Sequence, residues 1–77
     1  MNYEGFLTWL TTHKNLSERG ARDTVSRLKR ALHLISKEQV TETTTVELNM
    51  APSFIALSKF VKSQLRRSVA LYEEYIR

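Results

Sequence analysis

The chain is 77 residues long, with 42% hydrophobic and 26% charged residues, which predicts one globular domain, residues 1–77, with a thin core. It has no cysteine, no signal-peptide pattern and no apolar run near the ~18 residues of a membrane span. These absences exclude disulfides, thiolate metal sites and transmembrane helices, and they favour a cytoplasmic protein. The net charge of +4 suits a polyanionic partner, but on charge alone an ordinary solvated surface is the slightly favoured interpretation.

The first predicted element is a helix that Asn2 can cap. Polar residues gather at 13–15, where we expect this helix to end. Trp9 lies off the apolar stripe of the helix and is expected to be half-buried. The stripe recurs at helical spacing and consists of Tyr3, Phe6, Leu7 and Leu10.

The second predicted helix has the clearest pattern in the chain. Leu16 precedes Ser17, which places an apolar residue before an N-cap, and Leu16 can fold back onto Ala21 as a hydrophobic staple. Apolar residues then follow at spacings of 4, 3, 4 and 3, which predicts one narrow buried seam: Ala21, Val25, Leu28, Leu32 and Ile35.

The segment 36–50 changes character, because threonine and valine there alternate with acids. A lone strand would have no partner in this chain, so we expect a loop with Val46 and Leu48 packed against the core. Pro52 suits the first turn of a short third helix. The apolar side of that helix is expected to consist of Phe54, Ile55, Leu57 and Phe60.

Ser58 marks a bend and can cap the last helix. This helix continues in helical pattern to the end of the chain without a Gly or Asn C-cap, so we expect the natural protein to extend beyond residue 77. Together the elements predict an all-α fold, a small four-helix bundle whose third helix is short. Apolar residues of the last helix recur at spacings of 4, 4, 3 and 4: Val61, Leu65, Val69, Tyr72 and Ile76. Four aromatic residues fall on these seams and are expected in the core, with Trp9 and Tyr75 at its edge: Phe6, Phe54, Phe60 and Tyr72.

The sequence offers little for catalysis. His13 and His33 have neither cysteine nor paired-histidine spacing around them, so no metal site is expected. A glycine-rich phosphate loop and a nucleophile elbow are both absent. We therefore expect a non-catalytic protein with no catalytic residues and no cofactor.

Two of the predicted helices carry basic stripes. Residues 14–37 hold seven cations against two acids, and residues 59–67 hold four cations and no acid. Glu18 and Asp23 each precede an arginine by four residues and can neutralise it locally, as the pairs Glu18–Arg22 and Asp23–Arg27. If the two helices pack seam to seam with both stripes on one side, the stripes would form a surface suited to phosphates.

Three segments resemble the N-terminal SAM-like, or core-binding, domain of tyrosine recombinases, the phage integrase family. "LSERGARDTVSRLKRALHLI" is similar to the second helix of that domain, "VKSQLRRSVALYEEYI" to its final helix and "FLTWLTTHKNLS" to its first helix and turn. The chain departs from the family at Gly20, Thr24 and Ala31, where threonine, tyrosine and a larger apolar residue are usual. The family's catalytic chemistry is absent from these 77 residues.

The resemblance implies a SAM-like helical bundle that binds duplex DNA in integration and recombination, through its second and fourth helices. It leaves open whether the chain is part of a protein with a C-terminal catalytic domain or stands alone. The alternative is a protein-interaction or dimerisation module that uses Trp9, Tyr72, Tyr75 and the acidic segment 38–47. Carried over by position, the DNA-contacting residues would be Arg19, Arg22, Ser26, Lys29, Arg30, Lys62, Ser63, Arg66 and Arg67.

Overall fold

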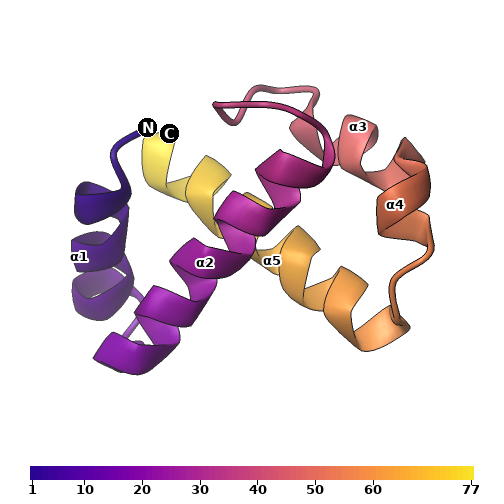
Figure 1. The fold of residues 1–77 in the computed structure, drawn as a ribbon. Helices are drawn as coiled ribbons and strands as arrows, with labels where there is room; N and C mark the ends of the chain where they lie inside the picture. Colours follow the sequence, from indigo (N-terminus) through magenta and orange to yellow (C-terminus); the bar gives the residue numbers. More distant parts are fainter.

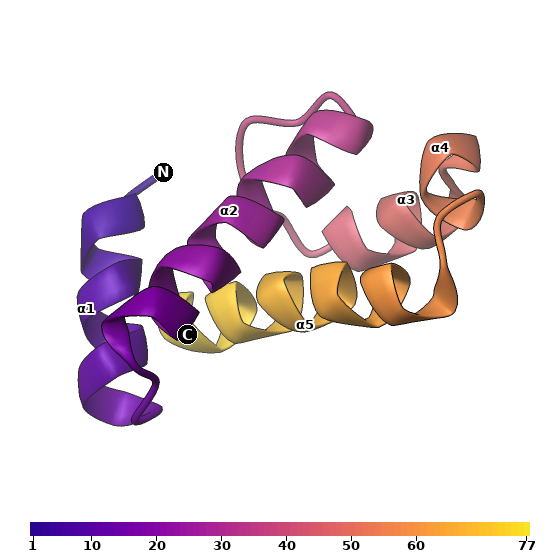
Figure 2. The same ribbon diagram turned by 60° about the horizontal axis from the view of Figure 1, so that its bottom comes forward.

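The computed structural model describes residues 1–77 and contains only helices. They are α1 (Tyr3–His13), α2 (Glu18–Leu34), α3 (Thr44–Met50), α4 (Pro52–Ile55) and α5 (Lys59–Ile76) (Figure 1). The two long helices, α2 and α5, cross at the centre of the molecule. In both views α1 lies at one end of this crossing and the short α3 and α4 lie at the other (Figures 1 and 2). The predicted all-α fold is confirmed.

Side-chain caps set the beginning of three helices, at the residues that the sequence predicts. Each cap satisfies a backbone N–H that has no partner inside its helix. Asn2 accepts a hydrogen bond from Gly5 N–H at 2.9 Å, Ser17 from Gly20 N–H at 3.0 Å and Ser58 from Val61 N–H at 3.2 Å.

The end of α2 is a Schellman turn built on a serine. Ser36 adopts a left-handed conformation with φ of 53°. This conformation lets Lys37 N–H donate to the Leu32 carbonyl at 2.9 Å, while Ser36 N–H donates to the His33 carbonyl at 3.1 Å. The turn therefore satisfies two carbonyls at the end of α2 and redirects the chain toward α3.

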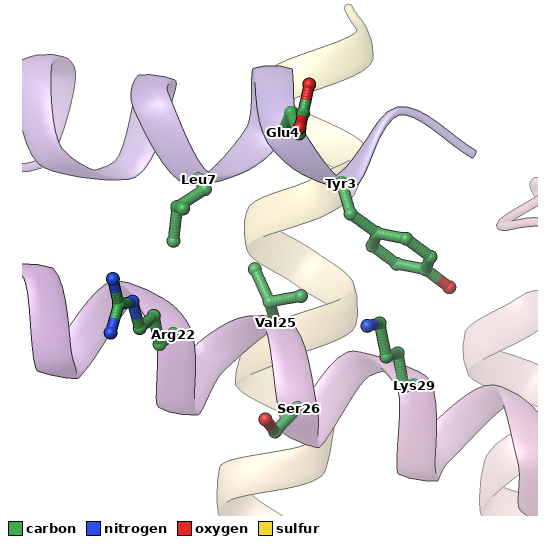
Figure 3. Close-up of a pocket in the computed structure, with 7 residues that line it drawn as sticks. All are labelled: Tyr3, Glu4, Leu7, Arg22, Val25, Ser26 and Lys29. Atoms are coloured by element: carbon green, nitrogen blue, oxygen red, sulfur yellow. The ribbon is translucent and has the colours of Figure 1, made fainter.

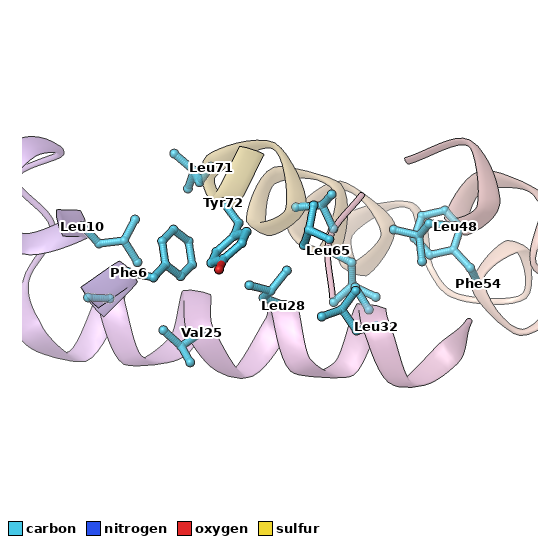
Figure 4. Close-up of a cluster of buried hydrophobic side chains, with 14 residues drawn as sticks. Phe6, Leu10, Val25, Leu28, Leu32, Leu48, Phe54, Leu65, Leu71 and Tyr72 are labelled. Carbon is cyan, nitrogen blue, oxygen red and sulfur yellow. The ribbon is translucent and has the colours of Figure 1, made fainter. Parts of the chain in front are cut away.

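The core is one cluster that runs the length of the molecule. The predicted seam of α2 faces the predicted seam of α5, and Figure 4 shows Leu28 and Leu32 projecting from α2 toward α5. At one end Phe6 packs edge-on against Tyr72, with ring centroids 4.9 Å apart. The full cluster is Phe6, Leu10, Ala21, Val25, Leu28, Ala31, Leu32, Val40, Leu48, Phe54, Leu65, Val69, Leu71 and Tyr72.

The expected loop at 36–50 is wrong in its second half, because α3 begins at Thr44. Thr44 and Leu48 are one helical turn apart and both are fully buried, whereas Val46 points outward and is 59% exposed. Leu48 thus packs on the core as expected, but Val46 does not. A seven-residue helix that packs against a core buries only one of its sides. In α3 that side carries Thr44 and Leu48, so Thr44 is buried where Val46 was expected to be.

The expected short third helix that begins at Pro52 is present as α4 (Pro52–Ile55). Because α3 is an additional helix within the expected loop, the bundle has five helices instead of four. Phe60, expected in the core, is 71% exposed, because it precedes the buried Leu65 by five residues, which rotates it about 140° around the α5 axis. Ile55 and Ile76, also expected on apolar seams, are 56% and 53% exposed.

Candidate nucleic-acid interface

The candidate residues of α2 form an exposed stripe along the helix. All of them are exposed, on the part of α2 that its buried seam leaves open to solvent. Because that seam packs against α5, the stripe lies outside the contact between α2 and α5. We call these residues the α2 stripe: Arg19, Arg22, Ser26, Lys29 and Arg30.

Acidic residues neutralise only part of the α2 stripe. Glu18 and Arg22 form the expected ion pair, with Oε1 and Nη2 2.5 Å apart. Both side chains are well exposed, so the pair contributes little to stability and can open at low cost. The expected pair of Asp23 with Arg27 does not form. Arg19, Lys29 and Arg30 make no ion pair and remain available to an anion.

Beside the α2 stripe, a groove of about 340 Å³ runs between α1 and α2 (Figure 3). Tyr3, Leu7 and Val25 supply its apolar surface. The other four lining residues are polar or charged: Glu4 from α1, and Arg22, Ser26 and Lys29 from α2. Three members of the α2 stripe therefore also line this groove, which the sequence did not predict.

Lys29 and Tyr3 form the contact that closes one end of the groove. Lys29 Nζ lies 4.8 Å from the centre of the Tyr3 ring, within the range of a cation–π interaction. Burial raises the pKa of the Tyr3 hydroxyl above its usual value, and the nearby Tyr72 raises it further. One face of the Tyr3 ring therefore lies beside an ammonium group.

The candidate residues of α5 lie in a different environment. Ser63, Arg66 and Arg67 are exposed and Lys62 is half-buried. Arg66 nevertheless contacts the short helices: its Nε donates a hydrogen bond of 2.8 Å to Asn49 Oδ1 of α3. Its guanidinium also lies 5.1 Å from the centre of the Phe54 ring of α4. Arg66 therefore acts at least in part as a structural residue.

Cationic residues of the two helices make their contacts at opposite ends of the molecule. The apolar seams of α2 and α5 pack against each other between these ends, as Figure 4 shows for Leu28, Leu32 and Leu65. The contacts of individual residues agree with this arrangement. Lys29 of α2 reaches toward α1, and Arg66 of α5 reaches toward α3 and α4, at the other end of the molecule (Figure 2).

Comparison with protein-family models, with curated protein sequences and with solved structures finds no match to this chain. The likeness to core-binding domains of recombinases therefore stays a prediction from the sequence. None of the helices has the combination of length and hydropathy that crossing a membrane requires.

Sequence reasoning missed the α1–α2 groove because it assigned Tyr3, Leu7 and Val25 to buried seams. All three do contact the core, but Tyr3 and Leu7 are only partly buried. One signal was present: Tyr3 and Leu7 are four residues apart on one edge of α1, beyond the fully buried Phe6 and Leu10. The link between Arg66 and Asn49 carried no such signal, because Asn49 lay in the expected loop.

Proposed function

We propose that this chain is a non-catalytic DNA-binding module that contacts the phosphates of duplex DNA mainly through α2. The observation that carries the proposal is the α2 stripe, in which three exposed cations have no acidic partner and a fourth has only an exposed one. The resemblance to the core-binding domain of phage integrase-type recombinases supports the same function. In that context the module would serve DNA integration or recombination.

The dimensions of the α2 stripe suit a polyanionic rod. Arg19 and Arg30 are eleven residues apart, which corresponds to about 16 Å along the helix axis. Duplex DNA presents about one negative charge for every 1.7 Å of its length. Neutralising four phosphates predicts a binding constant that falls about 100-fold between about 50 mM and about 200 mM salt. The dissociation constant at physiological salt would be on the order of 10⁻⁴–10⁻⁶ M, the range of non-specific binding.

The same geometry gives α5 a lesser part in the proposal. Ser63 and Arg67 are exposed and lie on the side of α5 opposite its buried residues Leu65 and Val69, so we expect a straight duplex on the α2 stripe not to reach them. Arg66 already donates a hydrogen bond to Asn49. We therefore expect the α5 residues Lys62, Ser63, Arg66 and Arg67 to contribute less than the α2 stripe to affinity for duplex DNA.

The test is an amide-shift titration of labelled protein with a short duplex of random sequence, at about 50 mM and about 200 mM salt. We expect shifts along the α2 stripe that disappear at the higher salt concentration. The variant pair Lys29→Glu with Arg30→Glu should abolish binding. The matched control on α5, Lys59→Glu with Arg67→Glu, makes the same change in net charge and should weaken binding much less. Equal losses in the two variants, or no shifts at low salt, would contradict the proposal.

A protein-interaction module is the second candidate function, and exposed apolar residues favour it. Met50 of α3 is 72% exposed, and Val46, Ile55 and Phe60 also lie open to solvent. Tyr72, which the sequence suggested for this role, is buried against Phe6 and is not available to a partner. Sedimentation at increasing concentration tests self-association directly: a monomer at every concentration contradicts dimerisation.

A further inference from the structure

We propose that the groove between α1 and α2 binds an unpaired nucleotide of DNA, next to a duplex that lies on the α2 stripe. This inference rests on the proposed function, because Arg22, Ser26 and Lys29 belong to both surfaces. It goes beyond that function because the bases of a duplex are stacked on one another and cannot pack against the apolar surface of the groove. The groove volume, about 340 Å³, lies at the lower end of the range for small-ligand sites.

The groove combines cationic groups with an apolar surface. On the α2 side, Arg22 and Lys29 lie seven residues apart, about 10 Å along the axis, and Ser26 lies between them along the helix (Figure 3). Tyr3 and Leu7 of α1 and Val25 of α2 present an aromatic ring and two aliphatic side chains. The site therefore fits a ligand that combines a planar apolar part with anionic groups at its edge.

An unpaired nucleotide has this combination, whereas a paired one does not present it. In a duplex the faces of the bases are covered by their neighbours, and only phosphates and groove edges are accessible. An unstacked base exposes its π face and can stack on an aromatic side chain. The Tyr3 ring is the aromatic group available for such stacking, and Leu7 and Val25 would line the sides of the base.

Lys29 can link binding of the phosphate to stacking of the base. Its ammonium group now lies over the Tyr3 ring, 4.8 Å from the ring centre. Moving toward a phosphate would exchange this cation–π contact for an ion pair and uncover the ring for the base. Glu4, the acid at the opposite rim, projects away from α2 (Figure 3). Its charge opposes a phosphate on the α1 side, which orients the phosphates toward Arg22 and Lys29.

The experiment compares three DNA probes by fluorescence anisotropy at low salt. The first is a blunt duplex of random sequence, the second carries a short single-stranded extension, and the third carries an extension of the same length made of abasic residues. The second and third probes have equal numbers of phosphates, so any difference between them reports the bases alone. We expect the base-bearing extension to bind about tenfold more tightly than the abasic one, the effect of a stacked base.

Two variants locate this effect. Tyr3→Leu should reduce the ratio between the two extended probes to less than about twofold, because leucine keeps an apolar side chain but offers no ring. Using the ratio removes any common effect of the substitution on duplex binding. Phe60→Leu removes an aromatic ring that is exposed elsewhere on the surface and should leave the ratio at about tenfold.

A second measurement keeps the proposal testable if Tyr3→Leu does not fold. In the unsubstituted protein, the base-bearing extension should shift the amide signals of Leu7 and Val25, and the abasic extension should not. Equal binding of the two extended probes overturns the inference while leaving duplex binding intact. If the blunt duplex itself fails to bind at low salt, the proposed function is wrong and the inference falls with it.

Discussion

Arg66 of α5 and Asn49 of α3 are joined by a hydrogen bond of 2.8 Å between Nε and Oδ1. The Phe54 ring of α4 lies against the same guanidinium, with its centre 5.1 Å away. One arginine therefore connects all three helices at this end of the molecule. A residue that the sequence suggested for DNA contact is thus used to hold the short helices in place.

Replacing Arg66 should consequently lower the stability of the fold. We expect Arg66→Ala to reduce the free energy of unfolding by about 1–2 kcal/mol, through loss of the hydrogen bond and of the contact with Phe54. Arg67→Ala, which removes an exposed arginine next to it in the chain, should change stability by less than about 0.5 kcal/mol. Urea denaturation followed by circular dichroism measures both values. Equal stability of the two variants would contradict a structural role for Arg66.

Gly5 allows a close contact between α1 and the end of α5. A Cβ atom at this position would lie 2.2 Å from the Tyr75 hydroxyl oxygen and 2.6 Å from Asn2 Nδ2. We expect Gly5→Ala to lower the free energy of unfolding by about 1–3 kcal/mol, as overpacking usually does. The cost should be smaller in a Tyr75→Phe background, which lacks the hydroxyl, and a double-mutant cycle measures this coupling.

A control at the other glycine separates crowding from backbone effects. At Gly20 the nearest atom to an added Cβ is Ser17 Oγ, at 3.2 Å, and a small shift of that hydroxyl relieves the contact. Gly20→Ala should therefore change stability by less than about 1 kcal/mol, because the helix preference of alanine offsets the crowding. A cost at Gly20 equal to that at Gly5 would contradict this assignment.

The left-handed conformation of Ser36 leads to a stabilising substitution. A non-glycine residue in this region costs about 1–2 kcal/mol, and glycine avoids the cost. Ser36→Gly should therefore raise the free energy of unfolding by about 1 kcal/mol. Ser63→Gly makes the same chemical change at an exposed position inside α5 and should lower it by about 0.5–1 kcal/mol. Thermal or urea denaturation of the pair checks the opposite signs.

The sequence predicts the long elements of the fold well, for a physical reason. In α2 the N-cap Ser17 and the seam from Ala21 to Leu32 depend on local spacing alone, and both are found in the structure. Phe60 shows where this reasoning fails. Apolar character predicts burial, but the partner surface that would cover a side chain at the start of α5 depends on how α4 folds back, which local spacing does not encode.

The candidate site likewise has features that local spacing predicts and features that it does not. The exposure of the α2 stripe follows from its position outside the seam and was predictable. The contacts of Lys29 with α1 and of Arg66 with α3 and α4 follow from the way in which the helices pack, which no helical pattern contains. The α1–α2 groove depends on the distance between two helices, and the role of Arg66 depends on Asn49, seventeen residues away in the chain.

The contrast between Leu28 and Phe60 tests the core directly. Leu28 is fully buried between α2 and α5, so Leu28→Ala should lower the free energy of unfolding by about 2–5 kcal/mol. Phe60→Ala removes a larger side chain that is 71% exposed, and it should change stability by less than about 0.5 kcal/mol. Urea denaturation of both variants measures the difference. A large loss at Phe60 would mean that the start of α5 packs differently.

Ionisation of Tyr3 makes the free energy of unfolding depend on pH in the alkaline range. Because burial and then Tyr72 raise the pKa of Tyr3 in the folded state, the hydroxyl ionises first in the unfolded chain, near its usual value of 10.0. The folded state therefore holds more protons above that pH, and the free energy of unfolding falls as pH rises. The stabilisation is complete below about pH 10 and is lost as pH rises through the higher pKa of the folded state. Tyr3→Phe cannot ionise, so urea denaturation across this range should give a shallower decline for the variant, and parallel declines would contradict the assignment.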